Sequence, residues 1–234
     1  ISVLDFIAIR DLILSKKISI VVVGPEDPLV NGIHDFLTNE IKNDNLIVIG
    51  PKKNGAILEG SKEFAKEFMY RHKIPTARYR TFNKKNIHEA NTFLSTLNPP
   101  YVLKADGLAA GKGVLILPDL NEAKKSLENM ILKKKFGQAS EKVVVEEYLK
   151  GIEVSSFVLT DGETYKIFPM AKDYKRVGIG DTGLNTGGMG AISPVPFVDQ
   201  KLYKKIENQV ILPTIRGLKK DKIDYTGFLF IGLM

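Results

Sequence analysis

The sequence predicts an α/β fold that continues into an α+β fold, and three observations lead to this class. Two apolar runs within the first 60 residues each end in Gly-Pro and precede a helical pattern, which is typical of part of a doubly wound parallel sheet. Short strand and helix patterns then alternate up to a hairpin turn near residue 161, as in α+β folds. With 44% hydrophobic and 26% charged residues among 234, the chain can bury the core of one or two domains.

The amino-terminal end predicts a soluble helix followed by a strand. Asp5, Arg10 and Asp11 interrupt its apolar pattern, and no apolar run reaches the roughly 18 to 20 residues of a membrane span. The chain has no cysteine, which excludes disulfides, thiolate metal sites and a cysteine nucleophile and fits a reducing compartment. We therefore expect a cytoplasmic protein.

Two strand–loop–helix units make up the first 71 residues. The continuous β-branched run Ile18–Gly24 predicts a buried parallel strand, and a helix can follow from Pro28. Residues 46–49 repeat the strand pattern, and Ser61 is placed to cap a helix that ends near Arg71.

The remaining elements follow from periodicity and turn residues. In chain order we expect strand 79–82, helix 87–97, strands 101–104 and 114–117, helix 120–134, strand 142–147, a hairpin turning at 161–162, helix 201–219 and strand 228–234. Six glycines between Gly178 and Gly190 are too many for a helix or a regular strand, so residues 172–196 should form a long functional loop.

A net charge of +7 raises the question of nucleic acid, because clustered Lys and Arg bind phosphates. The lysines here occur as short pairs and triplets without a recognition motif or an aromatic stacking series. Solvated faces explain them better, so we expect no nucleic-acid partner; local attraction for small phosphorylated ligands stays open.

The first candidate site is the segment 104–113, KADGLAAGKG. A predicted strand ends at Lys104, and Gly107, Gly111 and Gly113 follow within nine positions. Glycine permits close approach and positive φ, so such a loop can turn backbone N–H groups toward phosphate oxygens. It lacks the P-loop order, because Lys112 precedes glycine rather than Ser or Thr. A structural turn is the alternative.

The second candidate site is VVVEEYL at 143–149, followed by Gly-Ile-Glu to residue 153. A strand that ends in Glu146 and Glu147 and exits into an apolar segment can offer a backbone C=O and N–H to an adenine edge. Glu153 is close enough in sequence to accept ribose hydroxyls. An ordinary acidic surface hairpin is the alternative.

The third candidate site combines DYKR at 173–176 with DTGLNTGGMG at 181–190. Cationic side chains followed by glycine, hydroxyl and amide groups can bind an anionic substrate through paired charge and backbone donors. A flexible surface loop is the alternative.

The order strand-Lys, glycine loop, helix, strand-Glu-Glu-x-Leu-x-Gly-x-Glu resembles the ATP-grasp superfamily, whose two α+β subdomains bind ATP. This resemblance implies that Lys104 contacts the α- and β-phosphates, that 105–113 covers them, that the backbones of Glu147 and Leu149 pair with adenine, and that Glu153 binds ribose. The implied ATP-binding residues are Lys104, Gly107, Gly111, Lys112, Gly113, Glu146, Glu147, Leu149 and Glu153.

Five stretches resemble one member of that superfamily, the glycinamide ribonucleotide synthetase family. They are VGPEDPLVNGI at 23–33, LEGSK at 58–62, RHKIPTA at 71–77, LKADGLAAGKG at 103–113 and DTGLNTGGMG at 181–190. The resemblance runs from about residue 18 to 234. It implies a fold in which part of a doubly wound pre-ATP-grasp domain precedes an ATP-grasp fold.

The activity implied by the resemblance is ATP-dependent ligation of glycine to 5-phosphoribosylamine through glycyl phosphate, in de novo purine biosynthesis. Lys104 and Arg176 are the implied catalytic residues. The implied substrate-binding residues are Gly24, Pro25, Glu26, Asp173, Lys175, Arg176, Asp181, Asn185, Thr186, Gly187, Gly188, Met189 and Gly190. Another ATP-grasp ligase or carboxylase, or an inert nucleotide-binding module, is the alternative.

The resemblance also implies a division of the chain and a missing metal site. We expect a partial substrate-side domain at 1–60, a partial central subdomain from 61–78 and 148–234, and a small lid subdomain at 79–147. The family's GxGGREH loop and carboxy-terminal domain are not in the sequence. The Glu and Asn expected to hold Mg²⁺ or Mn²⁺ would lie beyond Met234, so we expect no metal ligands within the chain and, for this internal fragment alone, no turnover.

Overall fold

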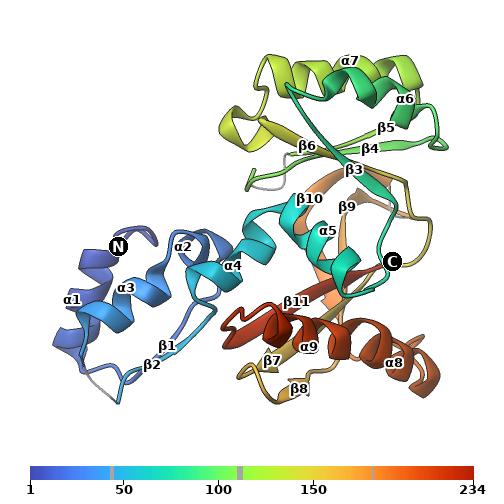
Figure 1. Ribbon diagram of the computed structural model, residues 1–234. Coiled ribbons are helices and arrows are strands. Elements are labelled where there is room, and N and C mark those ends of the chain that lie inside the picture. Colours follow the sequence, from blue (N-terminus) through green and yellow to red (C-terminus); the bar gives the residue numbers. More distant parts are fainter. Residues whose placement is uncertain (43–44, 110–112, 181) are drawn as a thin grey trace. The chain divides into compact units, whose positions relative to one another are not determined.

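The computed structural model describes residues 1–42, 45–109, 113–180 and 182–234, with the side chain of Asn185 also left out (Figure 1). Its contacts divide the chain into one unit of residues 1–48 and 52–149 and a second of 49–51 and 150–234. The predicted α/β and α+β class is confirmed; the predicted three-part division stays a prediction. Every helix in the described ranges is too short or too polar to cross a membrane.

The first unit begins with three helices and a two-stranded sheet. Its elements are α1 Phe6–Lys16, β1 Ile20–Val22, α2 Glu26–Val30, α3 Ile33–Glu40 and β2 Ile47–Ile49. Val21 and Val23 of the β1 region pack with Ile13 of α1 and Leu37 of α3, whereas Ile20 is exposed. The expectation of a fully buried strand at 18–24 was therefore wrong. The strand is shorter, and among the described residues apolar partners cover only one of its faces.

Two consecutive helices, α4 Lys53–Gly60 and α5 Lys62–Arg71, follow. The predicted cap at Ser61 is confirmed, because its Oγ accepts a hydrogen bond from the N–H of Phe64 at 3.1 Å. We did not predict α4, which contains Gly55 and ends at Gly60. Its first N–H, that of Lys53, donates to Asp35 Oδ2 at 2.8 Å, so a distant carboxylate stabilises its start.

A four-stranded antiparallel sheet forms the rest of the first unit, in the order β3-β6-β4-β5. Its strands are β3 Tyr79–Asn83, β4 Tyr101–Ala105, β5 Val114–Leu117 and β6 Lys142–Glu146, accompanied by α6 Ala90–Leu94, α7 Leu120–Leu132 and 3₁₀ turns at Ile87–Glu89 and Gly137–Ser140. Phe82, Leu103 and Val143 pack against Leu127 and Met130 of α7. Because side chains alternate along a strand, Lys104 and Glu146 point to the opposite face.

The second unit contains the antiparallel sheet β11-β7-β8. Its elements are β7 Val154–Thr160, β8 Tyr165–Ile167, α8 Gln200–Ile206, a π-helical turn Glu207–Ile211, α9 Leu212–Lys220 and β11 Gly227–Leu233. The predicted hairpin is confirmed: Asp161 Oδ1 accepts from the N–H groups of Glu163 and Thr164, and Gly162 has a φ of +92°.

Residues 172–192 form a hairpin rather than the long loop that we predicted. β9 Lys172–Gly178 pairs antiparallel with β10 Thr182–Ile192. The register shifts between Thr182 and Asn185 and again before Gly190. These irregularities leave extra β10 residues unpaired, so a strand can tolerate a glycine content that argues against regular pairing.

Candidate functional site

Glu146 and two lysines form an ion-pair cluster on the face of the four-stranded sheet that is opposite α7. Lys104 Nζ donates to Glu146 Oε2 at 2.9 Å, and Lys66 Nζ lies 3.3 Å from Oε1. The strand register explains the first contact, because Lys104 stands opposite Val144, two positions before Glu146 on the same face. Lys66 also donates to Thr76 Oγ1 at 2.7 Å. Both oxygens of the carboxylate are thus paired with ammonium groups.

Burial separates the roles of these charges. Lys66 and Glu146 are 7% and 5% exposed, whereas the Lys104 side chain keeps 30% of its surface accessible. Burial lowers the pKa of Lys66, and the charge of Glu146 opposes this shift. Lys104 is therefore the member of the cluster that can reach a ligand while Lys66 continues to neutralise Glu146.

The glycine loop is closed by backbone contacts. The N–H of Ala105 donates to the carbonyl of Gly113 at 2.8 Å, and that of Gly107 donates to Ala139 O at 3.2 Å. A Cβ on Gly113 would lie 2.8 Å from the Ala109 Cβ, and one on Gly107 would lie 3.1 Å from the Ala139 Cα. A side chain at position 113 would therefore force its neighbours to shift, and one at position 107 would be a tight fit. The predicted phosphate contacts of Gly107 and Gly113 stay predictions, and Gly111 and Lys112 lie outside the described residues.

The predicted adenine edge is partly used by the fold itself. The N–H of Glu147 donates to Arg78 O at 3.0 Å, and Glu147 Oε1 accepts from the N–H of Arg78 at 2.7 Å. Of the Glu147 backbone, only the carbonyl is left for an adenine amino group. Leu149 is exposed, and the predicted pairing of its backbone with adenine stays a prediction.

In the second unit, Lys175 joins two predicted site residues. Its Nζ donates to Glu153 Oε1 at 2.9 Å and lies 3.3 Å from Asp173 Oδ2. Burial alone would lower the pKa of Lys175, but its hydrogen bond and charge interactions with Glu153 and Asp173 together raise it. The hairpin therefore brings Asp173, Lys175 and Glu153 together.

The β9–β10 hairpin also positions the glycine-rich signature. Thr186 Oγ1 donates to Lys175 O at 2.8 Å and accepts from the N–H of Gly188 at 3.0 Å. Arg176 is exposed and pairs in register with Asn185. Among the other predicted residues, Gly187 and Gly190 have no described atom within 4 Å of an added Cβ, and Met189 is exposed. Asp181 lies outside the described residues, as does the side chain of Asn185.

The predicted amino-terminal substrate loop precedes α2. Gly24 and Pro25 are exposed, and Glu26 lies in the first turn of the helix, where a carboxylate is favoured by the helix dipole. Burial raises the pKa of Glu59, and the charge of Glu26 adds to this effect. The substrate role of these residues stays a prediction.

Three functional candidates escaped the sequence analysis. Lys62 Nζ lies 3.3 Å from Gly107 O, Lys66 contacts Glu146, and Asp106 accepts from Ser61. Lys62 and Lys66 are four residues apart on α5, so they share one helix face. That spacing was the available signal. The sequence did not show which way that face points, because its direction depends on packing against strands far away in sequence.

Comparison with known proteins identifies relatives across the whole chain. The profile of the phosphoribosylglycinamide synthetase ATP-grasp (A) domain matches residues 60–234, and that of the N domain of the same synthetase matches residues 1–59. The phosphoribosylamine–glycine ligase of Chlorobaculum tepidum is 45% identical over 98% of this chain and 53% of its own length. The Escherichia coli enzyme of that name is 44% identical over 100% of this chain and 53% of its own length. The chain spans about half the length of these relatives.

Solved structures agree with this similarity. The phosphoribosylamine–glycine ligase of Thermotoga maritima aligns with a TM-score of 0.75 and 39% identity, over 85% of this chain and 49% of that one. A second similar structure is a biotin carboxylase domain from Hydrogenobacter thermophilus, crystallised with MgADP, ADP and bicarbonate. It aligns with a TM-score of 0.69 and 19% identity over 98% of this chain and 48% of that one. At that identity the second likeness shows the fold alone.

Proposed function

The chain belongs to the phosphoribosylglycinamide synthetase family, and from this premise we propose that it binds ATP and substrates in a ligase that joins glycine to 5-phosphoribosylamine. The observation that carries the proposal is the ion pair between Lys104 and Glu146 beside the glycine loop. It holds a partly exposed ammonium group beside that loop, and this supports the proposal because an ammonium group makes charge-assisted contacts with phosphate oxygens. The products would be glycinamide ribonucleotide, ADP and phosphate.

Glycine must be activated because a carboxylate resists attack by an amine. In the proposed first step, a carboxylate oxygen of glycine attacks the γ-phosphorus of ATP; the bond to ADP breaks, and glycyl phosphate forms. Positioning and charge neutralisation supply most of the catalysis of phosphoryl transfer. Lys104 would neutralise phosphate oxygens, and Glu146 would keep its side chain directed toward them.

In the proposed second step, the amine nitrogen of phosphoribosylamine attacks the acyl carbon. Phosphate leaves with one former carboxylate oxygen, and the nitrogen loses a proton to solvent. Arg176 is the better candidate for binding the substrate phosphate, because it is exposed and its guanidinium can make two parallel hydrogen bonds. Lys175 is held by Glu153 and Asp173, so its proposed role is to orient these carboxylates.

The described residues do not fit a magnesium site. Within the described ranges, no group of three or more His, Asp or Glu side chains could hold a metal ion. The carboxylates of Glu146 and Glu153 are each paired with ammonium groups within their own units.

The proposal is tested with a protein that carries this chain at the full length of its relatives. Sustained release of ADP from ATP should require both glycine and phosphoribosylamine, because glycyl phosphate formed without its acceptor is not consumed. Replacing glycine by bicarbonate or D-alanine should give no ADP. Release with bicarbonate but not with glycine would contradict the proposal and identify a carboxylase.

A further inference from the structure

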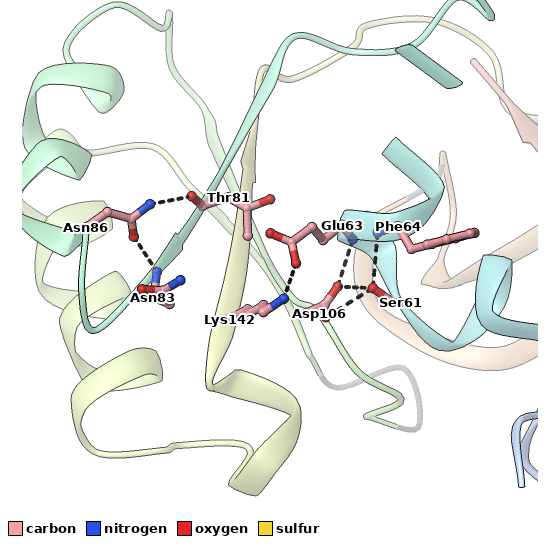
Figure 2. A network of polar contacts seen from close by, with 8 residues as sticks. All are labelled: Ser61, Glu63, Phe64, Thr81, Asn83, Asn86, Asp106 and Lys142. Atoms are coloured by element: carbon pink, nitrogen blue, oxygen red, sulfur yellow. Dashed lines mark hydrogen bonds and ion pairs between the residues drawn. The ribbon is translucent and has the colours of Figure 1, made fainter. Parts of the chain in front are cut away.

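Asp106 is an unexpected residue at the start of a loop proposed to approach phosphates, because a free carboxylate there would repel them. It immediately follows β4 and precedes Gly107. Its side chain is directed to α5 instead. Figure 2 shows it pointing toward Ser61 and Glu63 at the first turn of that helix.

The contacts of this carboxylate satisfy donors at the helix start. Asp106 Oδ1 accepts from Ser61 Oγ at 3.0 Å and from the N–H of Glu63 at 2.7 Å, while Oδ2 lies 3.2 Å from Ser61 Oγ. Ser61 Oγ in turn accepts from the N–H of Phe64. Two of the first N–H groups of α5 are thus bound, one by its own cap and one by the loop. The helix dipole favours the negative charge there.

Lys62 of α5 also donates to the loop backbone. The N–H of Lys62 donates to Asp106 O at 3.2 Å, and Lys62 Nζ lies 3.3 Å from Gly107 O. From the sheet side, the N–H of Asp106 donates to Lys142 O at 3.1 Å. Lys142 also forms an ion pair with Glu63 (Figure 2). The loop entry is therefore fixed from both the helix and the sheet.

We propose that Asp106 is a positioning residue that locks the loop entry, residues 105–107, to the start of α5 and so fixes the start of the loop that is proposed to approach phosphate. This inference rests on the proposed nucleotide site and deepens it. Fixing the loop before the ligand arrives removes an ordering cost from binding. Loss of the Asp106 contacts should therefore lower the affinity for the phosphates of a nucleotide and leave the affinity for its adenosine part unchanged.

The test compares Asp106→Ala, Asp106→Asn and Asp119→Ala in the 234-residue chain. Asp119 caps α7 by accepting from the N–H of Glu122 at 2.9 Å. Asp119→Ala is therefore the matched control, because it also removes an aspartate that accepts from a helix N-terminus but does so away from the loop. Calorimetry with ADP and with adenosine measures affinity. Hydrogen exchange of the amides of Ala105, Gly107 and Glu63 measures the lock without any nucleotide.

Asp106→Ala should weaken ADP binding by roughly tenfold or more and leave adenosine binding within about twofold, a loss of preorganisation. It should also speed exchange at all three amides. Asp106→Asn should keep most of the ADP affinity and most of the slow amide exchange, because the amide oxygen still accepts from Ser61 and Glu63. Asp119→Ala should change neither. If Asp106→Ala does not fold, Ser61→Ala, which removes the hydroxyl between Asp106 and Phe64, should show the same pattern.

Two outcomes separate this inference from the proposed function. If the unmodified chain binds neither ligand but Asp106→Ala still speeds exchange at Ala105 and Gly107, the nucleotide site is refuted and the loop lock stands as a structural feature only. If exchange at Gly107 is unchanged in Asp106→Ala, or if ADP and adenosine weaken equally, Asp106 does not position the loop and the inference is overturned.

Discussion

Lys104 donates to Glu146 across adjacent strands at 2.9 Å, with only Lys104 of the two partly exposed. A phosphate that approaches Lys104 competes with this carboxylate for one ammonium group. Lys66, 3.3 Å from the other oxygen, keeps Glu146 paired when Lys104 turns to a ligand. The pair therefore holds in place, without nucleotide, the cation that we propose binds phosphate.

Lys104→Ala should weaken ADP binding because it removes a charge-assisted contact, typically on the order of 1.5 to 3 kcal/mol. Lys134→Ala is the control, since Lys134 pairs with Glu141 and is exposed. Calorimetry on both variants measures the difference. Equal affinities would remove Lys104 from the site.

Lys66→Met should change how stability depends on pH. The folded-state pKa of Lys66 is lowered from 10.5 by burial, so the unfolded chain binds more protons in the alkaline range below that value. Stability then rises with pH across this window. The unmodified chain should gain stability relative to Lys66→Met as the pH approaches 10.5, measured by denaturant unfolding with the exposed-site variant Lys134→Met as the baseline. A pH-independent difference would show that folding does not lower the pKa of Lys66.

Glu153→Gln should reduce the preference for ATP over 2′-deoxy-ATP and 3′-deoxy-ATP, because a carboxylate accepts ribose hydroxyls more strongly than an amide does. Folding should be nearly unaffected, since the Glu153 side chain is 41% exposed. Competition binding with the three nucleotides measures the preference. An unchanged preference would show that Glu153 contacts Lys175 but not the ribose.

Gly113→Ala should lower the free energy of unfolding by about 1 to 3 kcal/mol, the usual cost of overpacking, because its Cβ would lie 2.8 Å from that of Ala109. Gly187→Ala is the matched control, since nothing lies within 4 Å of its added Cβ. Thermal unfolding of both variants would test this. Equal stability would mean that the loop does not pack on itself as described.

Local signals in the sequence located most elements, and non-local ones explain the failures. Ser61 identified the start of α5 because a cap and its N–H are three residues apart. Helix α4 was missed because Asp35, which binds its first N–H, is 18 residues earlier. The β9–β10 hairpin was missed because its register shifts depend on pairing that composition does not reveal.

The candidate site divides in the same way. Lys104 and Glu153 were predicted from motifs, because each lies at a recognisable strand end or turn. The glycine-loop motif contains Asp106 but predicted no role for it, and its partner Ser61 is 45 residues away. The carboxylate's role depends on the fold that brings α5 to the loop, so no pattern within the loop indicated it.

Transfer of oxygen from glycine to phosphate tests the central claim most directly. A protein that carries this chain at the full length of its relatives would be supplied with ATP, phosphoribosylamine and glycine labelled with oxygen-18 in its carboxylate. Mass spectrometry of the products should find one labelled oxygen in each released phosphate, because the acyl–phosphate bond breaks with the former carboxylate oxygen on phosphorus. Label that stays wholly in the amide product would contradict the acyl-phosphate route and, with it, the proposed reaction.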